Sequence, residues 1–369
     1  MRRQLIIQTA LAACAGVGVL VTVRLFAAAE APAAPKPQGE QEAAPVDPKA
    51  EKARTTKALS VVRDSAQSVE ARAKAIQEIG FIADDPDAIR MLQAIVGDPQ
   101  QDNALRLAAT RQLPVFDQPA AIDALIAVAE DPKAGSDLKV AAIEQLQSAV
   151  AFTPAGKARA PQILQALRRA LDDPRAIVRR RAIDYLALIN DEVAVNLLKT
   201  ILADKGEPPG EPKFTKAEAV RYLALEDPRK HFEAIRPALD ASEPEARAAA
   251  VTALGADPAS RPQITRLLDA PDQPTQVKAA ALQSLAAYDP QFPTYVTKYL
   301  QDKGLNPAVR SAAIDAVGRA VNSGKVAEPR VQALTEQIRE IPEDAPDAVK
   351  KSAQQYLQLR APAPPEPDK

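Results

Sequence analysis

Apolar residues along most of the chain follow the spacing of one helix face. The stretch at 172–189, DDPRAIVRRRAIDYLALI, shows the pattern most clearly, with an apolar row at Val178, Ala182, Ile183 and Leu186. Residues separated by three, four and eight positions, as Ile183 and Leu186, Val178 and Ala182, and Val178 and Leu186 are, fall on one side of an α-helix, and charged residues occupy much of the remaining surface. The stretch therefore predicts an amphipathic helix that buries one face.

The same pattern recurs nine times. We number its positions as slots from slot 0 at Val178, so that Arg179 is slot 1, Ala182 is slot 4 and Leu186 is slot 8. In every copy slot 1 is Lys or Arg, slot 4 is Ala, and slot 8 is Ile, Leu or Val. Slot 0 of the nine copies lies at Ala71, Leu105, Leu138, Val178, Thr215, Ala246, Val277, Val309 and Val349, with successive copies 31 to 40 residues apart. Such regular spacing is typical of a solenoid built from stacked repeats.

Other segments between these helices have apolar rows of their own, at 88–96, 120–131, 162–172 and 193–204. Asp–Pro pairs such as Asp173–Pro174 punctuate the joins. An aspartate can cap the exposed amides at a helix start, and Pro fits the first helical position. Each repeat is therefore expected to be a helix, a turn and a second helix. The prediction for 50–360 is an all-α fold, an α-α superhelix of about nine helix pairs, in which the slot-4 alanines mark close helix contacts.

The repeated residues resemble the HEAT family of helical repeats, in the short HEAT-like form also seen in phycobilisome lyase subunits. The matching segments are D-P-x-x-x-V-R-x-x-A-I-x-x-L at 173–186, PEARAAAVTAL at 244–254 and NPAVRSAAIDAVG at 306–318. The resemblance implies a HEAT-like solenoid with an Asp/Arg ladder between its units. Nothing beyond the repeat core matches the lyases, so no chromophore chemistry is carried over.

Composition argues against several classes of function. The chain has 47 Lys and Arg against 48 Asp and Glu, whereas proteins that bind nucleic acid usually carry a basic excess. Cys14 and His231 are the only residues of their kinds in the sequence. A Cys-based zinc site is thereby excluded, and no phosphate-binding or hydrolase motif is present. We predict no catalytic, metal or cofactor site, and no binding of nucleic acid.

The N-terminal segment 1–28 predicts export or membrane attachment. Arg2 and Arg3 precede an uncharged apolar run from Leu5 to Val23, 19 residues long, which is just enough to span a bilayer. Three readings remain open: an uncleaved signal anchor, a signal peptide cleaved near AAAE, or a lipoprotein in which LAAC places the lipid on Cys14. Residues 29–49 then predict an extended Pro/Ala-rich linker, and residues 361–369 a similar tail. All three readings place the repeats in the bacterial cell envelope, in the periplasm or exported.

Two sets of residues are candidates for binding a partner. Arg179 fills the recurrent basic slot and is expected to be structural, with its stem on apolar surface and its head bonded to turn carbonyls or a carboxylate. Two further arginines of that helix stand at slots 2 and 3, and three others lie close in sequence. The basic candidates are Arg168, Arg169, Arg175, Arg180 and Arg181. They form either a patch for an acidic partner or an ordinary mixed-charge surface.

The second set is an aromatic cluster within the stretch YDPQFPTYVTKYL. It consists of Tyr288, Phe292, Tyr295 and Tyr299, of which the last three have the spacing of one helix face. Aromatic side chains often anchor protein interfaces. The alternative is a bulky core between the seventh and eighth repeats.

Taken together, these patterns favour a non-catalytic scaffold that binds other proteins in the cell envelope, through residues at the variable slots. A HEAT-like lyase or maturation factor acting on a client protein is the first alternative. A mechanical spacer in an envelope complex is the second.

Overall fold

The computed structural model describes residues 48–79, 86–203, 213–324 and 326–360, which belong to one compact unit. These ranges contain helices and turns and no strand, as expected for an all-α fold. The predicted leader with Cys14, nearly all of the linker and the tail lie outside the described residues. The first helix starts at Pro48, two residues inside the segment expected to be linker. None of the helices within the described ranges has both the length and the apolar character needed to cross a bilayer.

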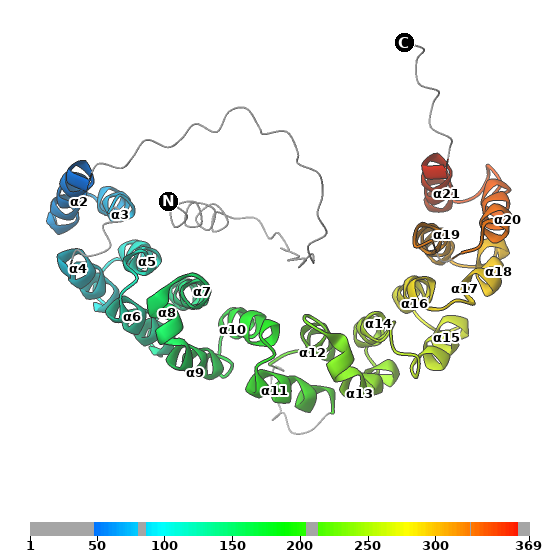
Figure 1. Ribbon diagram of the computed structural model, residues 1–369, viewed down its shortest axis with the longest axis horizontal. Coiled ribbons are helices and arrows are strands. Elements are labelled where there is room, and N and C mark those ends of the chain that lie inside the picture. The colour runs from blue at the N-terminus through cyan, green and yellow to red at the C-terminus, as the bar shows by residue number, and fades with distance from the viewer. Residues whose placement is uncertain (1–47, 80–85, 204–212, 325, 361–369) are drawn as a thin grey trace, which may run out of the picture. The chain divides into compact units, whose positions relative to one another are not determined.

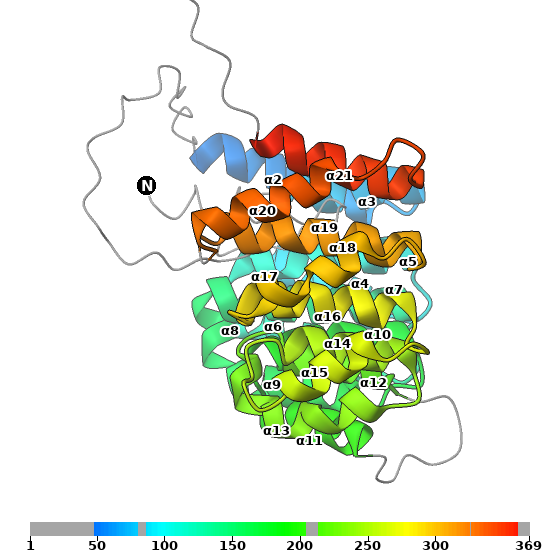
Figure 2. The ribbon, with the colours of Figure 1, turned by 90° about the vertical axis from the view of Figure 1, so that its right-hand side faces the viewer.

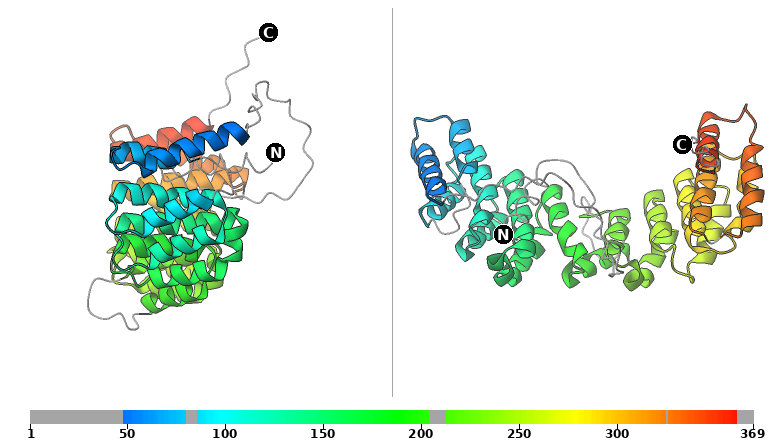
Figure 3. Two further views of the ribbon diagram at one scale, coloured as in Figure 1. Left: turned by 90° about the vertical axis from the view of Figure 1, so that its left-hand side faces the viewer. Right: turned by 45° about the horizontal axis from the view of Figure 1, so that its top comes forward.

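The helices form two rows, seen in Figure 1 and from the sides in Figures 2 and 3. The second-row helices carry the slots and are α3 (Val69–Gln77), α5 (Asn103–Gln112), α7 (Ser136–Phe152), α10 (Ala176–Leu188), α12 (Lys216–Leu223), α14 (Pro244–Ala253), α16 (Thr275–Tyr288), α19 (Pro307–Asn322) and α21 (Asp347–Arg360). Each of them packs against the next member of its row.

The first-row helices precede them in each repeat. They are α2 (Pro48–Arg63), α4 (Pro86–Gly97), α6 (Pro119–Glu130), α9 (Ala160–Ala170), α11 (Glu192–Leu202), α13 (Phe232–Ile235), α15 (Arg261–Asp269), α18 (Thr297–Gln301) and α20 (Glu328–Arg339). Short helices add to three repeats: α8 (Pro154–Ala158), η2 (Pro228–His231), η3 (Arg236–Asp240) and α17 (Phe292–Tyr295). A further turn of 3₁₀ helix, η1 (Leu113–Phe116), follows α5. The described residues thus form nine helix pairs, the number expected from the repeat.

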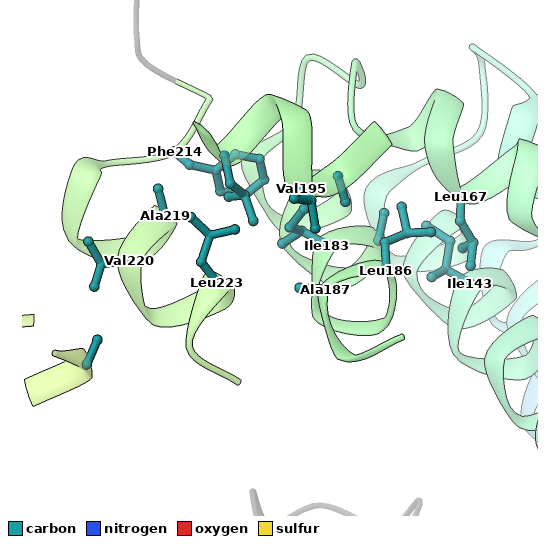
Figure 4. Close-up of a cluster of buried hydrophobic side chains, with 14 of the residues drawn as sticks. Ile143, Leu167, Ile183, Leu186, Ala187, Val195, Phe214, Ala219, Val220 and Leu223 are labelled. Carbon is teal, nitrogen blue, oxygen red and sulfur yellow. The ribbon is translucent and has the colours of Figure 1, made fainter. Parts of the chain in front are cut away.

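The slot-4 alanines lie where neighbouring helices approach closely. All nine are buried, and seven of them have no exposed surface: Ala109, Ala142, Ala182, Ala219, Ala250, Ala281 and Ala313. The slot-8 side chains line the same core, which continues from one repeat to the next, as Figure 4 shows from Ile143 through Ile183 and Leu186 to Leu223. The apolar pattern therefore marks the face by which each repeat covers its neighbours.

The recurrent basic residue has a structural role, as expected for Arg179. Its Nη1 donates to the carbonyl oxygens of Asp173 and Pro174, at 2.9 and 2.8 Å, and the residue is 7% exposed. Arg72, Arg106 and Arg310 donate in the same way to carbonyls ten residues earlier, where the preceding first-row helix ends. These arginines at slot 1 thus satisfy carbonyl groups in the turn before their own helix or in the last turn of the preceding first-row helix.

The expectation for the Asp–Pro pairs is wrong at most joins. Asp98, Asp131, Asp173, Asp257 and Asp289 each accept a hydrogen bond from the amide two residues later. This closes an Asx turn before the next helix starts, so the proline stands in the turn and not in the first helical position. Only Asp227–Pro228 among the described pairs has the expected arrangement, with Asp227 as the cap of η2.

Candidate functional site

The five candidate arginines are all engaged within the chain. Arg168 pairs with Asp191, the N-cap of α11, through Nη2–Oδ2 at 2.7 Å, and Arg169 pairs with Glu130 at 2.7 Å. Both arginines stand on the first-row helix α9, whereas Arg180 and Arg181 stand on the second-row helix α10. The arginines that are close in sequence therefore do not form one free basic patch.

The two candidate arginines on α10, Arg180 and Arg181, connect three second-row helices. Arg180 Nη2 lies 2.7 Å from Glu218 Oε1 on α12, and Arg181 Nη2 lies 3.1 Å from Glu144 Oε1 on α7. Tyr222 on α12 donates its hydroxyl to Asp184 on α10 at 3.0 Å. Burial, reinforced by the charge of Asp184, raises the pKa of this tyrosine. This surface is a ladder of partly exposed ion pairs and hydrogen bonds.

Arg175 belongs to a buried network in the turn before α10. Its Nε and Nη2 each lie 2.8 Å from the carboxylate of Asp173, which also accepts from Lys139 Nζ at 2.9 Å. The side chains of Lys139 and Asp173 are 7% and 4% exposed. The bonds from Arg175 and Lys139 hold the pKa of Asp173 well below its usual range, despite its burial. The Lys139–Asp173 contact joins the third and fourth repeats in the way that the family resemblance implied for its Asp/Arg ladder, whereas Arg72, Arg106 and Arg310 bond to carbonyl oxygens instead.

The aromatic cluster does not share one helix face. The chain forms two short helices, α17 and α18, which meet at Val296, so the expectation of one continuous helix is wrong. Phe292 is fully buried and packs edge-on against the ring of Tyr295, with 5.8 Å between centroids. Tyr299 is 5% exposed and donates its hydroxyl to Asp269. These three side chains form the bulky core between the seventh and eighth repeats, and burial raises the pKa of both tyrosines.

Tyr288 differs from the other three because it is 49% exposed. Its ring packs against Gly255, where an added Cβ would stand 3.0 Å from the ring and 2.4 Å from Ser284 Oγ. The absence of a side chain at Gly255 therefore lets α16 come close and fixes the position of the ring. Tyr288 stands at the edge of a depression of about 480 Å³ on the second row.

The depression lies over α12, α14 and α16, and its floor is made mostly of small side chains. Its lining comprises Val220, Arg221, Ala224, Pro228, Glu245, Ala248, Ala249, Thr252, Ala253, Ala256, Gln276 and Tyr288. Glu245 accepts a weak hydrogen bond from Gln276 at 3.4 Å. Arg221 is exposed and has no ion-pair partner among the described residues. We call this surface the α14 depression.

The comparisons with known proteins agree with the fold. A family model described as HEAT repeats matches residues 137–209. This segment carries HEAT repeats. No curated protein matches the chain in sequence.

Solved HEAT-repeat structures resemble the chain at low sequence identity. Kap121p has a TM-score of 0.54 at 14% identity, over 82% of this chain and 37% of that one. Yeast importin-beta (Kap95p) has a TM-score of 0.50 at 16% identity, over 85% of this chain and 51% of that one. A Kap95:Nup1 complex has a TM-score of 0.53 at 16% identity, over 85% and 51%. The chain thus spans about half or less of these structures, and the likeness concerns the fold.

Chemically, the α14 depression can receive apolar side chains and includes one guanidinium, that of Arg221. No cluster of three or more His, Cys, Asp or Glu suitable for a metal ion occurs in the part of the chain that the structure describes. Sequence reasoning missed the alanines at slots 2 and 3 of α14, Ala248 and Ala249. Their signal is visible in PEARAAAVTAL, the copy in which small residues fill most of the variable slots.

Proposed function

We propose that the HEAT repeats serve as a protein-binding scaffold, and that the α14 depression receives an apolar segment of a partner protein. The observation that carries the proposal is an alanine-lined hollow that includes the exposed Tyr288, and whose charged lining residues, Arg221 and Glu245, form no ion pair within the described ranges. Aromatic residues at the edge of a hollow are frequent anchors of protein interfaces. Arg221, which lines the depression, would form an ion pair with an acidic residue of the same partner segment.

The solved relatives support a protein as the occupant. Two of these helical solenoids are described with protein partners: Kap95 with Nup1, and Kap121p with Nup53p or with Pho4p. Stacked helical repeats present a long surface of similar helices, on which the variable positions set the specificity. In this chain the variable slots of α10 are occupied by the ion-pair ladder, while those of α14 remain available.

The test compares two substitutions at the same slot of different repeats. Thr252→Arg fills the α14 depression, whereas Gln77→Arg places the same side chain at slot 6 of α3, where the residue is also exposed. Proteins crosslinked to the full chain in cells are identified by mass spectrometry for each variant. We expect Thr252→Arg to remove a partner that Gln77→Arg retains.

Tyr288→Ala provides a second, milder change in the depression. Loss of an anchoring aromatic costs about 2 kcal/mol, which is a weakening of about 30-fold in Kd. A partner bound equally by all three variants would show that the α14 depression is not its site. Equal loss with Gln77→Arg would point to general disturbance of the fold.

We also propose that the N-terminal segment tethers this scaffold in the cell envelope. The support is the sequence alone: the apolar run Leu5–Val23 with Arg2 and Arg3 before it. N-terminal mapping of the mature protein distinguishes the open readings. An intact leader indicates an anchor, a start at Glu30 indicates cleavage, and lipid labelling lost in Cys14→Ser indicates a lipoprotein. A chain recovered entirely in the cytoplasmic fraction would refute the tether.

A further inference from the structure

The junction between the fourth and fifth repeats is built differently from those that follow it. Across α10 and α12, Arg180 pairs with Glu218 and Asp184 accepts from Tyr222. These two helices lie in looser contact than the other neighbouring second-row pairs in the described ranges. α12 is also short, with 8 residues against 13 in α10. Phe214 fills the core beside α12, as Figure 4 shows.

His231 makes a further polar link at this junction. Its Nε2 lies 3.1 Å from Oδ1 of Asn190, which stands in the turn after α10 in the left-handed conformation, with a φ of 56°. Because an amide oxygen only accepts, Nε2 must carry the proton of the neutral ring. His231 thereby ties the turn after α12 to the turn after α10, which are 41 residues apart in sequence.

The second ring nitrogen, Nδ1, is buried and has no hydrogen-bond partner among the residues that the structure describes. The residue as a whole is 8% exposed. A proton added at Nδ1 would be a buried donor without an acceptor, which is costly.

The charges that act on the ring are mixed. Lys199 on α11 and Lys230 on η2 oppose a positive charge on the ring, while Asp227 and Glu226 at the start of η2 favour it. Burial, with the two lysines, lowers the pKa of His231 below its ordinary value. The two carboxylates do not outweigh these effects, since Asp227 is already bound to Arg229 and Glu226 to Lys230.

We propose that the fourth and fifth repeats meet in a pH-sensitive joint, closed while His231 is neutral and loosened when the ring becomes doubly protonated. Opening would hydrate Nδ1 and separate the ring from Lys199. Because the closed form binds the proton less well than the open form, the closed form is favoured above the ordinary histidine pKa of about 6.5 and is lost as pH falls below it. The contacts Arg180–Glu218 and Asp184–Tyr222 lie on the partly exposed surface of the joint, where water can replace them at little cost. The apolar side chains beneath them, Leu186, Leu223 and Phe214, stay buried, so that the joint loosens without separating the two repeats.

The test measures distances across the joint in the full chain, solubilised in detergent. Cys14→Ser removes the only native cysteine. Spin labels at Lys157→Cys on α8 and Arg266→Cys on α15 then span the joint, and labels at Arg266→Cys and Arg319→Cys on α19 form a matched pair on one side of it. All three positions are exposed. We expect the spanning distance distribution to shift and broaden between about pH 7.5 and about pH 5, around the histidine pKa, while the matched pair is unchanged.

Two variants isolate the imidazole. His231→Gln can still donate to Asn190 but does not titrate, so the shift should disappear. Lys199→Gln, at an exposed position, removes a repelling cation and should reduce the shift even if His231→Gln does not fold. The proposal is overturned if the spanning distance is independent of pH, if the matched pair shifts as much, or if both variants respond as the unmodified protein does.

Discussion

The buried carboxylate of Asp173 offers the sharpest test of how the repeats are joined. Asp173→Ala would leave the ammonium group of Lys139 without its partner at a site where the lysine side chain is only 7% exposed. Arg175 would lose the same partner, but its side chain is 30% exposed and water can replace the bonds. The cost therefore comes mainly from Lys139.

The magnitude follows from burial. Breaking a buried ion pair by removing one member costs about 3–5 kcal/mol, because the remaining charge has neither water nor a counter-charge. Asp172, the adjacent residue, also pairs with a lysine, Lys213, but its side chain is 73% exposed. Exposed pairs contribute about 0–1 kcal/mol. Asp172→Ala is thus a control of the same type, one residue away.

The assay is urea unfolding of both variants, followed by circular dichroism and compared through the transition midpoints. Asp173→Ala should unfold at clearly lower urea than Asp172→Ala, which should stay close to the unmodified chain. Adding Lys139→Met to Asp173→Ala removes the stranded charge and should restore part of the loss. Equal midpoints for Asp173→Ala and Asp172→Ala would refute the idea that this pair holds the third and fourth repeats together.

Three other changes have expected outcomes. Ala109 occupies slot 4 of α5 and has no exposed surface, so Ala109→Leu should overpack the core and lower the free energy of unfolding by about 1–3 kcal/mol in urea unfolding. Ala104→Leu, on the exposed side of the same helix, should have little effect in the same assay. Gly156→Ala should strongly destabilise the turn between α7 and α8, because the added Cβ would lie 2.2 Å from the carbonyl of Ala149. Gly97→Ala is the control: its added Cβ would meet no atom within 4 Å, so its melting temperature should be unchanged or slightly higher. The pKa of Asp173 is lowered in the folded state, so ionised Asp173 stabilises the fold above the ordinary carboxyl pKa of about 3.9, and this stabilisation is lost as pH falls below it. Asp173→Asn should therefore make the free energy of unfolding, measured by urea unfolding at several pH values, depend less on pH in the acid range.

Much of the fold was predictable because the helices repeat. Slot 4 is Ala in each copy, and the buried alanines and the nine helix pairs follow from that single pattern. The role of Arg179 was predictable for the same reason, since a basic residue that recurs at one slot must serve something that recurs in the structure. Repetition supplies many observations of one local environment, which a single helix does not.

Features that occur once were harder to predict. The sequence shows which residues are basic but not that Arg180 and Arg181 reach Glu218 and Glu144, which lie 38 and 37 residues away. Such pairs depend on which slots face each other across the stack. The break at Val296 is likewise not visible in the sequence pattern, because Phe292 and Tyr299 have helical spacing although they stand on separate helices, α17 and α18.

The division between paired and unpaired slots also bears on where a partner would bind. On α10 the variable slots hold charged side chains that already satisfy one another, so a partner would have to break those pairs and remove water from them before gaining any contact. On α14 the corresponding slots hold Ala248, Ala249 and Thr252, and covering them displaces only water from small apolar surface. We therefore expect the free energy of binding to be most favourable over α14, where alanines stand in place of the ion pairs of α10, next to Tyr288.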